Sequence, residues 1–390
     1  MSTGEWMILF KVGGPVVGKD FYGREETLET LYKDLVEQGK LGYVVYGPRR
    51  IGNTSLLEEF SNTVEKRGSA TPVYFDVSSL HPFEIESFHD HLFLKCVEAF
   101  KPKREIRARL AEALKGSGDA LASLLRSAEV SVGIKDYLQV KIGVKEKKAS
   151  LQDLIKKSFG IAESLAKETD SRAILIFDEF QMVEDLEKNT IWAIRSIAQD
   201  WKNTSIIVCG SEVSLLEQMI LPKTAPFFQL LKPCQLGPFD EATAIGMMQE
   251  KFTKAGLSFG KDELKEIFNI TGGYPYYLQW LGDKIYDSEE KKVSKMVIEG
   301  ALKAMLAEGD AIFRSSLERL SAGEKDVLIE IGLETEQLSE IAKKTEKPMP
   351  NIAKMVERLT EKSYVRKKAP GRYAMIDPML KKWIAMVYGI

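Results

Sequence analysis

A chain of 390 residues is long enough for two or three domains with a large hydrophobic core. Its 55 basic and 57 acidic side chains nearly cancel, which excludes a global positive field and leaves nucleic-acid binding to a local patch. Three scattered cysteines and the lack of an apolar run near ~18 residues exclude a disulfide framework, a zinc site and a membrane span, so we expect a cytoplasmic protein.

The first half of the chain alternates between predicted helices and strands. Residues 21–26 lead into an amphipathic helix that ends near residue 37, and a glycine loop and a second helix follow the first core strand. Core strands are expected near 41–46, 72–77, 173–178 and 205–210, with a further strand at 234–236. Strands that alternate with helices predict an α/β fold with a parallel sheet covered on both faces.

The glycine loop follows the strand at 41–46 and opens a helix expected from Thr54 to Arg67. It has the spacing Gly-x4-Gly-x-Thr, in which backbone N–H groups and the helix N-terminus surround phosphates. The position before the threonine normally holds a lysine for the β- and γ-phosphates, and here it holds Asn53. A chance match in a glycine turn is the alternative. The residues assigned to nucleotide contact are Gly47, Pro48, Arg49, Arg50, Ile51, Gly52, Asn53, Thr54 and Ser55.

Two acids, Asp178 and Glu179, end the apolar strand at 173–178. In P-loop ATPases an acid at this strand end holds Mg²⁺ through water, and a following glutamate polarises the attacking water. We therefore assign Asp178, with the Thr54 hydroxyl, to Mg²⁺ and Glu179 to the water. Ser211 follows the next strand and is either a sensor of the γ-phosphate or a cap for the helix at 212–220.

Residues 101–150 interrupt this alternation. A charged helix at 103–115 and a Gly-Ser turn precede two runs at 130–134 and 138–144, and the second run alternates as a β-hairpin does. The insert is either a surface for a protein partner or an additional flap.

The pattern becomes helical from residue 239 to about residue 307, where a Gly-Gly-Tyr-Pro turn at 272–275 opens a helix. Three short helices at 325–331, 338–344 and 350–362 then precede a basic hairpin and an apolar helix around Trp383. This order predicts a winged helix-turn-helix. The alternative is that the winged helix packs internally and that its basic residues form an ordinary solvated rim. The candidate DNA contacts are Lys354, Arg358, Arg366, Lys367, Lys368 and Arg372.

Through these motifs the chain resembles the archaeal ATPases of the STAND branch of the AAA+ class of P-loop NTPases. The resemblance implies a P-loop AAA+ domain at 1–238, a helical lid at 239–318 and a winged-helix domain at 319–390. It also implies that Tyr274 and Pro275 contact adenine, with Arg24 on the other side of the base. The motifs that carry it are Phe21-Tyr22-Gly23-Arg24-Glu25, Tyr46-Gly47-Pro48-Arg49-Arg50-Ile51-Gly52, Phe177-Asp178-Glu179-Phe180-Gln181, Gly210-Ser211, Thr271-Gly272-Gly273-Tyr274-Pro275 and Ile376-Asp377-Pro378.

Two departures from that family bear on activity. Asn53 offers neutral donors where the family has a charged lysine, a loss of ~2–4 kcal/mol of transition-state stabilisation, or about two to three decades in rate. The family also usually carries a Gly-Arg pair after an aromatic residue, where this chain has Gln229 and Leu230. An arginine that would face the γ-phosphate is therefore missing.

These observations favour a switch that binds ATP or ADP with Mg²⁺, hydrolyses ATP slowly or not at all, and selects a protein partner or a second copy by its nucleotide state. The alternative is a DNA-binding regulator or mobile-element defence protein that acts through its winged helix. An active ATPase motor would need self-association and a trans-acting arginine, for which the sequence offers no clear candidate.

Overall fold

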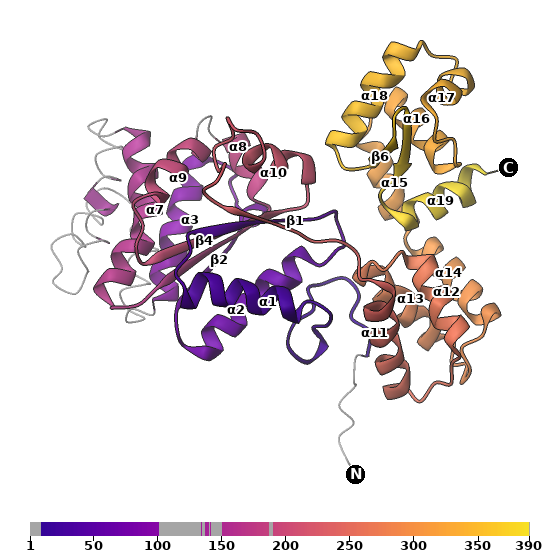
Figure 1. The fold of residues 1–390 in the computed structure, drawn as a ribbon, viewed down its shortest axis with the longest axis horizontal. Helices are drawn as coiled ribbons and strands as arrows, with labels where there is room; N and C mark the ends of the chain where they lie inside the picture. The colour runs from indigo at the N-terminus through magenta and orange to yellow at the C-terminus, as the bar shows by residue number, and fades with distance from the viewer. Residues whose placement is uncertain are drawn as a thin grey trace.

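The computed structural model describes residues 9–100, 134, 137–139, 141, 150–186 and 190–389. Figure 1 shows an α/β part on the left, formed by residues up to 240, and two smaller parts beside it. The helical part covers residues 241–308, and the C-terminal part covers residues 310–389. Among the described residues, no helix combines the length and the apolar character that crossing a membrane requires.

One sheet of five parallel strands organises the α/β part, in the order β2-β3-β4-β1-β5. All residues of β1, β3 and β4 are buried, as expected for apolar strands covered on both faces. The α/β class and the five predicted strands are confirmed. The strands are β1 (Gly42–Tyr46), β2 (Thr71–Asp76), β3 (Ala173–Asp178), β4 (Thr204–Gly210) and β5 (Lys232–Gln235).

Side chains alternate along the strands between two hydrophobic cores, one on each face of the sheet. Val45 and Ile176 enter the core that contains α1 and α2, whereas Val44 and Phe177 enter the core that contains α3, α7, α9 and α10. The helices of the α/β part are α1 (Glu25–Tyr32), α2 (Asn53–Arg67), α3 (Ile85–Ala99), α7 (Leu151–Glu168), α8 (Val183–Leu186), α9 (Thr190–Ala198) and α10 (Val213–Ile220), with short turns η1 (Gly18–Asp20), η2 (Lys33–Glu37), η3 (Val77–Ser79) and η4 (Phe180–Met182).

The carboxyl ends of the parallel strands meet at one edge of the sheet. β1 lies between β4 and β5, and β3 lies next to β4. This order brings the glycine loop after β1, Asp178 at the end of β3 and Gly210 at the end of β4 to the same edge. Ligands of open α/β sheets bind at this edge, so the topology itself selects the place of the site.

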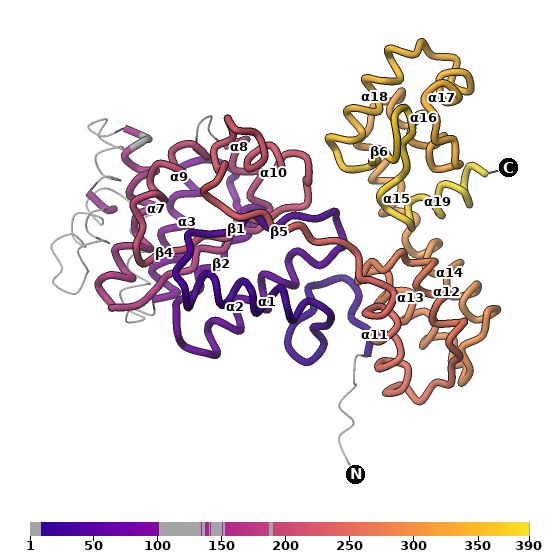
Figure 2. The backbone as a smooth tube through the Cα atoms, viewed as in Figure 1, coloured from indigo at the N-terminus to yellow at the C-terminus, as the bar shows by residue number. Residues whose placement is uncertain are grey.

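The helical part follows β5, and the N-terminal segment packs against it. Figure 2 shows the beginning of the described chain beside α11, before it enters the α/β part. The Leu9 carbonyl accepts from Lys251 Nζ at 2.6 Å, and the Phe10 ring lies 6.0 Å from the Phe252 ring. The helices of this part are α11 (Glu241–Lys254), α12 (Lys261–Thr271), α13 (Pro275–Asp287) and α14 (Lys295–Glu308).

The C-terminal part has the element order predicted for a winged helix-turn-helix. Its antiparallel hairpin pairs Val365 with Met375, and the buried Trp383 of the last helix lies 5.8 Å from the Phe313 ring. The elements are α15 (Asp310–Glu318), α16 (Ala322–Gly332), α17 (Leu338–Lys344), α18 (Met349–Glu361), β6 (Val365–Ala369), β7 (Arg372–Met375) and α19 (Pro378–Tyr388).

The β-hairpin predicted inside residues 101–150 is wrong where the structure describes this insert. Ile134, Tyr137, Leu138 and Lys141 are helical and buried. Their spacing of three, four and seven residues places them on one face of a helix, and this period describes them better than alternation does. The charged helix and the Gly-Ser turn predicted at 103–118 lie outside the described residues.

Candidate functional site

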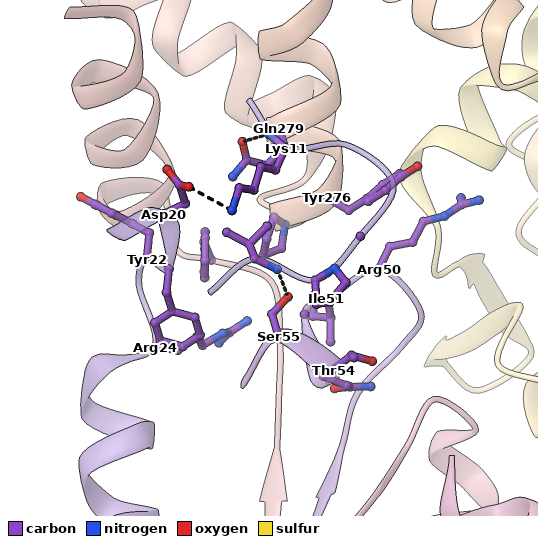
Figure 3. A pocket seen from close by; sticks show the side chains of 18 of the residues that line it. Lys11, Asp20, Tyr22, Arg24, Arg50, Ile51, Thr54, Ser55, Tyr276 and Gln279 are labelled. Atoms are coloured by element: carbon purple, nitrogen blue, oxygen red, sulfur yellow. Dashed lines mark hydrogen bonds and ion pairs between the residues drawn. The ribbon is translucent and has the colours of Figure 1, made fainter. Parts of the chain in front are cut away.

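A cavity of about 360 Å³ lies over the glycine loop, between the α/β part and the helical part (Figure 3). Eleven of the predicted site residues line it: Arg24, Arg49, Arg50, Ile51, Gly52, Asn53, Thr54, Ser55, Glu179, Ser211 and Pro275. The N-terminal segment and α13 supply further walls that residue types alone did not reveal. These additional lining residues include Lys11, Pro15, Val16, Asp20, Tyr276 and Gln279.

The two glycines of the loop are favoured at their positions for different reasons. Gly52 has a φ of 94°, a left-handed conformation that glycine adopts easily, and a Cβ there would meet no protein atom within 4 Å. The space above it is therefore open to a ligand. Gly47 packs so closely that a Cβ would lie 2.5 Å from the Leu236 carbonyl oxygen. Helix α2 begins at Asn53 and directs its free N–H groups at this space.

Asn53 is buried, and its side chain is turned to the protein backbone. Its Nδ2 donates to the Gly47 carbonyl at 2.9 Å and to the Gly210 carbonyl at 3.2 Å. An amide group has only two N–H donors, so both are used inside the protein. Its Oδ1 is buried without a partner among the described residues. The side chain thus ties the loop to the end of β4 and offers no free donor to a phosphate.

The predicted metal ligands Thr54 and Asp178 lie in contact. Thr54 Oγ1 donates to Asp178 Oδ2 at 2.7 Å, and the Tyr74 hydroxyl donates to the same oxygen at 3.1 Å. A hydroxyl and a carboxylate are the oxygen ligands that Mg²⁺ prefers, so these residues fit the ion. Within the described ranges no group of three or more His, Cys, Asp or Glu side chains could hold a metal.

Glu179 lies on the wall of the cavity in a constrained position. Its backbone is left-handed, with a φ of 49°, and its carboxylate accepts from Gln181 Nε2 and from Ser211 Oγ at 3.3 Å. Burial raises the pKa of Glu179, and the nearby Asp178 acts in the same direction. A half-buried carboxylate with a raised pKa is suited to accept a proton from water.

The Ser211 side chain contacts the Glu179 carboxylate and does not cap α10. Glu212 occupies the N-cap position of α10 without a side-chain hydrogen bond, and the Ser211 hydroxyl donates to Glu179. The capping alternative for Ser211 is therefore wrong, because the serine side chain is committed to the site. Gly210 before it is also constrained, since a Cβ there would lie 1.9 Å from Gln181 Oε1.

The N-terminal segment is fastened over the start of α2. Val16 N donates to Ser55 Oγ at 2.9 Å, and Gly18 N donates to Glu59 Oε2 at 2.6 Å. Figure 3 shows Lys11, Asp20 and Gln279 at the end of the cavity away from Thr54. This segment makes the cavity deeper than the loop alone would, and its polar end lies opposite the glycine loop.

Arg24 and the Gly-Gly-Tyr-Pro turn lie where the cavity passes between the α/β part and the helical part. The Arg24 guanidinium lies 4.9 Å from the Phe239 ring centroid and donates to the Gly237 carbonyl. Pro275 and Tyr276 line the cavity. Tyr274, which was expected at adenine, lies instead in a second cleft, where its hydroxyl donates to the Ile376 carbonyl at 3.0 Å.

Arg50 connects all three parts of the molecule. Its guanidinium donates to the Tyr277 hydroxyl on α13 and to Asp377 Oδ2 at 3.1 Å, at the start of α19. The Tyr277 hydroxyl in turn donates to Asp377 Oδ1 at 2.7 Å. Arg50 has a left-handed backbone, with a φ of 69°, that turns the side chain out of the loop. It thus points toward the neighbouring parts, away from the phosphate space above Gly52.

The loop between α10 and β5 has the conformation expected of a glycine at Gln229. The φ of Gln229 is 58°, a region that favours glycine. The next residue is Leu230, which packs partly buried against the core. The chain therefore keeps the backbone turn but supplies no charged side chain at the position after it.

The six candidate DNA contacts are exposed on the C-terminal part. Lys354 and Arg358 are four residues apart on α18 and so share one face of that helix. Lys368 pairs with Glu336 at 2.5 Å. The far end of α18 contacts the α/β part, where Ser214 Oγ donates to the Thr360 carbonyl at 3.2 Å. The basic face of α18 thus stays open while its C-terminal end is docked.

Comparison with known proteins agrees with this geometry. A family model described as an ATPase domain predominantly from Archaea matches residues 21–281, more than half of the chain. The chain is 21% identical over 291 residues to the uncharacterized ATP-binding protein MJECL15 of Methanocaldococcus jannaschii, which covers 73% of this chain and 77% of that protein. It is 24% identical over 273 residues to the uncharacterized ATP-binding protein MJ1010 of the same organism, over 67% and 70% of the two chains.

Two solved structures share the fold over nearly the whole chain. A Walker-type ATPase of Pyrococcus abyssi aligns with 96% of this chain and 99% of its own, with a TM-score of 0.70 and 19% sequence identity. The ORC2 protein of Aeropyrum pernix, in ADPNP and ADP complexes, aligns over 98% and 97%, with a TM-score of 0.59 and 13% identity. The likeness extends through the helical and C-terminal parts.

Proposed function

Because this chain belongs to the family of ATPase domains found predominantly in Archaea, we propose that it is a nucleotide-binding switch of the STAND branch of the AAA+ class. It binds ATP or ADP with Mg²⁺ in the cavity over the glycine loop. Hydrolysis is weak or abolished, and the nucleotide state is transmitted to the helical lid and to the winged helix.

The observation that carries this proposal is the use of both Asn53 N–H donors by the carbonyls of Gly47 and Gly210. The position that holds a charged lysine in an active P-loop therefore contributes neither charge nor donor to the phosphates. Binding can persist, since the N–H groups at the start of α2 and the walls of the cavity are unaffected. Transition-state stabilisation suffers most, because it depends on charge placed at the transferring phosphoryl group.

The remaining residues have separate roles in the proposed site. Thr54 and Asp178 hold Mg²⁺, which neutralises phosphate charge when bound. Gln181 and Ser211 hold the Glu179 carboxylate toward the cavity, where it orients a water molecule and accepts its proton. Arg24, Phe239 and Pro275 lie along the cavity and enclose the base.

The transmission of nucleotide state is proposed to pass through Arg50. Residues of the glycine loop move with the phosphates that they surround, and Arg50 joins this loop to Tyr277 and Asp377. A shift of the loop would therefore change the contacts of both neighbouring parts. Through these contacts of Arg50, a movement of the glycine loop would change the positions of both the helical part and the C-terminal part.

The test is to compare this protein with its Asn53→Lys and Asn53→Ala variants in Mg²⁺-dependent ATP binding and turnover. We expect all three to bind nucleotide, and Asn53→Lys to raise kcat about 100- to 1000-fold. Asn53→Ala removes the tie to Gly47 and Gly210 without adding charge, so its turnover should stay low. Turnover of the unchanged protein equal to that of Asn53→Lys would refute the proposal, as would a failure of every variant to bind.

A second candidate function is DNA binding through the winged helix. It is favoured by Lys354 and Arg358, which are exposed on one face of α18 and make no ion pair with another described residue. Titration of duplex DNA at several salt concentrations tests it. Replacing both residues by Gln should lower the slope of log affinity against log salt by about 2, because two phosphate contacts are lost. Unchanged slopes would exclude this face.

A further inference from the structure

Two buried amide side chains at the end of β4 have oxygen atoms that no donor reaches. Asn53 Oδ1 and Gln181 Oε1 make no hydrogen bond with any part of the chain that the structure describes. Asn53 is 9% exposed and Gln181 is 6% exposed, so bulk water does not supply the missing donors. An unpaired buried oxygen is costly, and two of them at one place indicate a ligand that takes up their lone pairs.

The nitrogen atoms of the two amides fix how these oxygens point. The Asn53 N–H groups donate to the Gly47 and Gly210 carbonyls, and Gln181 Nε2 donates to the Glu179 carboxylate. Turning either amide over would place its oxygen against those acceptors, so the hydrogen-bond network assigns the nitrogens to these positions. The two oxygens therefore remain on the other side of each amide, where they can only accept.

The two amides meet at Gly210 and at the residue after it. Asn53 Nδ2 lies 3.2 Å from the Gly210 carbonyl oxygen, and Gln181 Oε1 packs so closely on Gly210 that a Cβ there would lie 1.9 Å from it. Ser211 Oγ donates to the Glu179 carboxylate at 3.3 Å. Asn53, Glu179 and Ser211 line the same cavity. One strand end thus collects two neutral oxygen acceptors and a carboxylate.

The positive charge expected at this place is missing. Asn53 is neutral and stands at the lysine position of the P-loop pattern, while Asp178 and Glu179 bring two carboxylates. Arg50 is paired with the C-terminal part. Arg49 lines the cavity, but it is exposed and makes no ion pair with another described residue. The strand end therefore has an excess of oxygen acceptors and of negative charge, which a bound cation would balance.

We propose that this strand end binds a monovalent cation of the size of K⁺, with Asn53 Oδ1 and Gln181 Oε1 among its ligands and Glu179 as the charge beside it. This inference rests on the proposed function and deepens it, since the cation would supply the charge of the absent lysine when nucleotide is bound. Neutral carbonyl-type oxygens suit K⁺, because they replace its hydration shell. Mg²⁺ keeps several waters and prefers carboxylate and phosphate oxygens, so two neutral amides are a poor site for it.

The test is calorimetric titration of the full chain with Mg-ADP, in KCl and in tetramethylammonium chloride of equal ionic strength. We expect binding to be about tenfold tighter in KCl, because the bound cation adds one charge-assisted contact. NH₄Cl should act as KCl does, since the two cations are similar in size, and LiCl should not. Asn53→Lys carries its own charge, so its affinities in KCl and in tetramethylammonium chloride should be equal.

Two further variants each remove one proposed ligand. Gln181→Met and Asn53→Leu keep a side chain of similar size without the amide oxygen, and each should abolish the advantage of KCl. Gln279→Met is the matched control, because Gln279 lines the same cavity and its Oε1 already accepts from Lys11 N at 3.3 Å. Arg49→Gln is a second control, since it removes the nearby arginine and leaves both amides in place. In both controls the advantage of KCl should remain.

Thallium NMR gives a readout that does not depend on nucleotide affinity, because Tl⁺ substitutes for K⁺. With Mg-ADP in a nitrate buffer, the unchanged protein should show a bound Tl⁺ signal that K⁺ displaces, and Gln181→Met should not. Equal nucleotide affinities in all salts, with no bound Tl⁺, would overturn the inference. An advantage of KCl that persists in both Gln181→Met and Asn53→Leu would also overturn it, because the cation would then act elsewhere. Failure of the unchanged protein to bind Mg-ADP in any salt would instead overturn the proposed function.

Discussion

The Asn53 side chain replaces a contact with the ligand by a contact within the protein. A lysine at this place would extend a flexible charged chain toward phosphate, whereas the short amide stays beside the backbone and pairs with two carbonyls. The exchange strengthens the link between the loop and β4. It also leaves out the charge that phosphoryl transfer requires, so the proposed retention of binding and the proposed loss of turnover would have one common cause.

The buried imidazole of His89 makes stability depend on pH. Ser158 Oγ contacts its Nδ1 at 2.6 Å, and burial lowers the pKa of His89 to about 3, with the charge of Lys141 acting in the same direction. Below its ordinary pKa of about 6.5 the unfolded chain takes up a proton that the folded chain refuses. The free energy of unfolding should therefore fall by about 2 kcal/mol between pH 6.5 and pH 5 because of this group.

Urea unfolding at the two pH values measures this contribution. His89→Gln should remove it, so that the variant loses less stability on acidification than the unchanged protein. His91→Gln is the control, because the His91 ring is exposed and its Nδ1 contacts the Ser87 carbonyl at 2.7 Å. Equal losses in the unchanged protein and in His89→Gln would contradict the assignment.

At the scale of elements, helix starts determine where this protein places its functional groups. Helix α2 begins at Asn53 and presents its N–H groups to the phosphate space, and α13 begins at Pro275 on the cavity wall. Helix α19 begins after Asp377, whose Oδ1 accepts from Met379 N at 2.9 Å and from Leu380 N at 3.0 Å. The same carboxylate therefore caps a helix and receives Arg50.

These two roles of Asp377 are separable by substitution. Asp377→Asn keeps a capping oxygen and loses the charge that faces Arg50, whereas Asp377→Ala loses both. We expect Ala to cost about 1–2 kcal/mol more than Asn in unfolding free energy, because the cap is lost only with Ala. Asp240 is the control, since it caps α11 through Thr243 N at 2.7 Å and has no ion pair with a described residue.

Asp240→Asn should leave the free energy of unfolding nearly unchanged. Asp240→Ala should lower it only by the contribution of the helix cap. At Asp377, Asn should itself be destabilising, because Arg50 and Tyr277 lose their charged acceptor. Chemical denaturation monitored by circular dichroism gives all four values. If Asn were equally neutral at both positions, the contact between Arg50 and Asp377 would contribute nothing to stability.

For the molecule as a whole, contacts of Arg50 and of α18 join the C-terminal part to the α/β part. Arg50 donates to Asp377 of the C-terminal part and to Tyr277 of the helical part, and its guanidinium lies 5.5 Å from the Phe313 ring centroid. Its side chain is only 20% exposed. Truncating a partly buried charge of this kind costs about 2–5 kcal/mol, which is enough to release a neighbouring part.

Arg50→Gln should therefore let the C-terminal part move away from the α/β part in the absence of nucleotide. Small-angle X-ray scattering should show a larger radius of gyration than that of the unchanged protein. Arg49→Gln is the control, because the adjacent loop arginine makes no ion pair with a described residue and its loss should not alter the shape without nucleotide. An unchanged radius in Arg50→Gln would show that other contacts hold the C-terminal part.

The local pattern of apolar and turn residues was sufficient to predict most of the strands and helices. The core strands and the hairpin after α18 fall within a few residues of their expected positions. Short apolar runs and turn residues specify such elements without reference to distant parts of the chain. The β-hairpin predicted in the insert at 101–150 is wrong where the insert is described, because a short sequence of apolar and polar residues fits both a strand and one face of a helix.

The sequence by itself determined that this protein has a glycine loop before a helix and an acidic pair after a strand. It also determined that Asn53 and Leu230 stand at the two positions where the resemblance implies a lysine and an arginine. These features depend on neighbours along the chain. Only the tertiary structure decided that the Asn53 donors bond to Gly47 and Gly210, and that Arg50 reaches Asp377 across 327 positions. Those contacts arise where three parts of the chain pack together, and residue spacing carries no information about that packing.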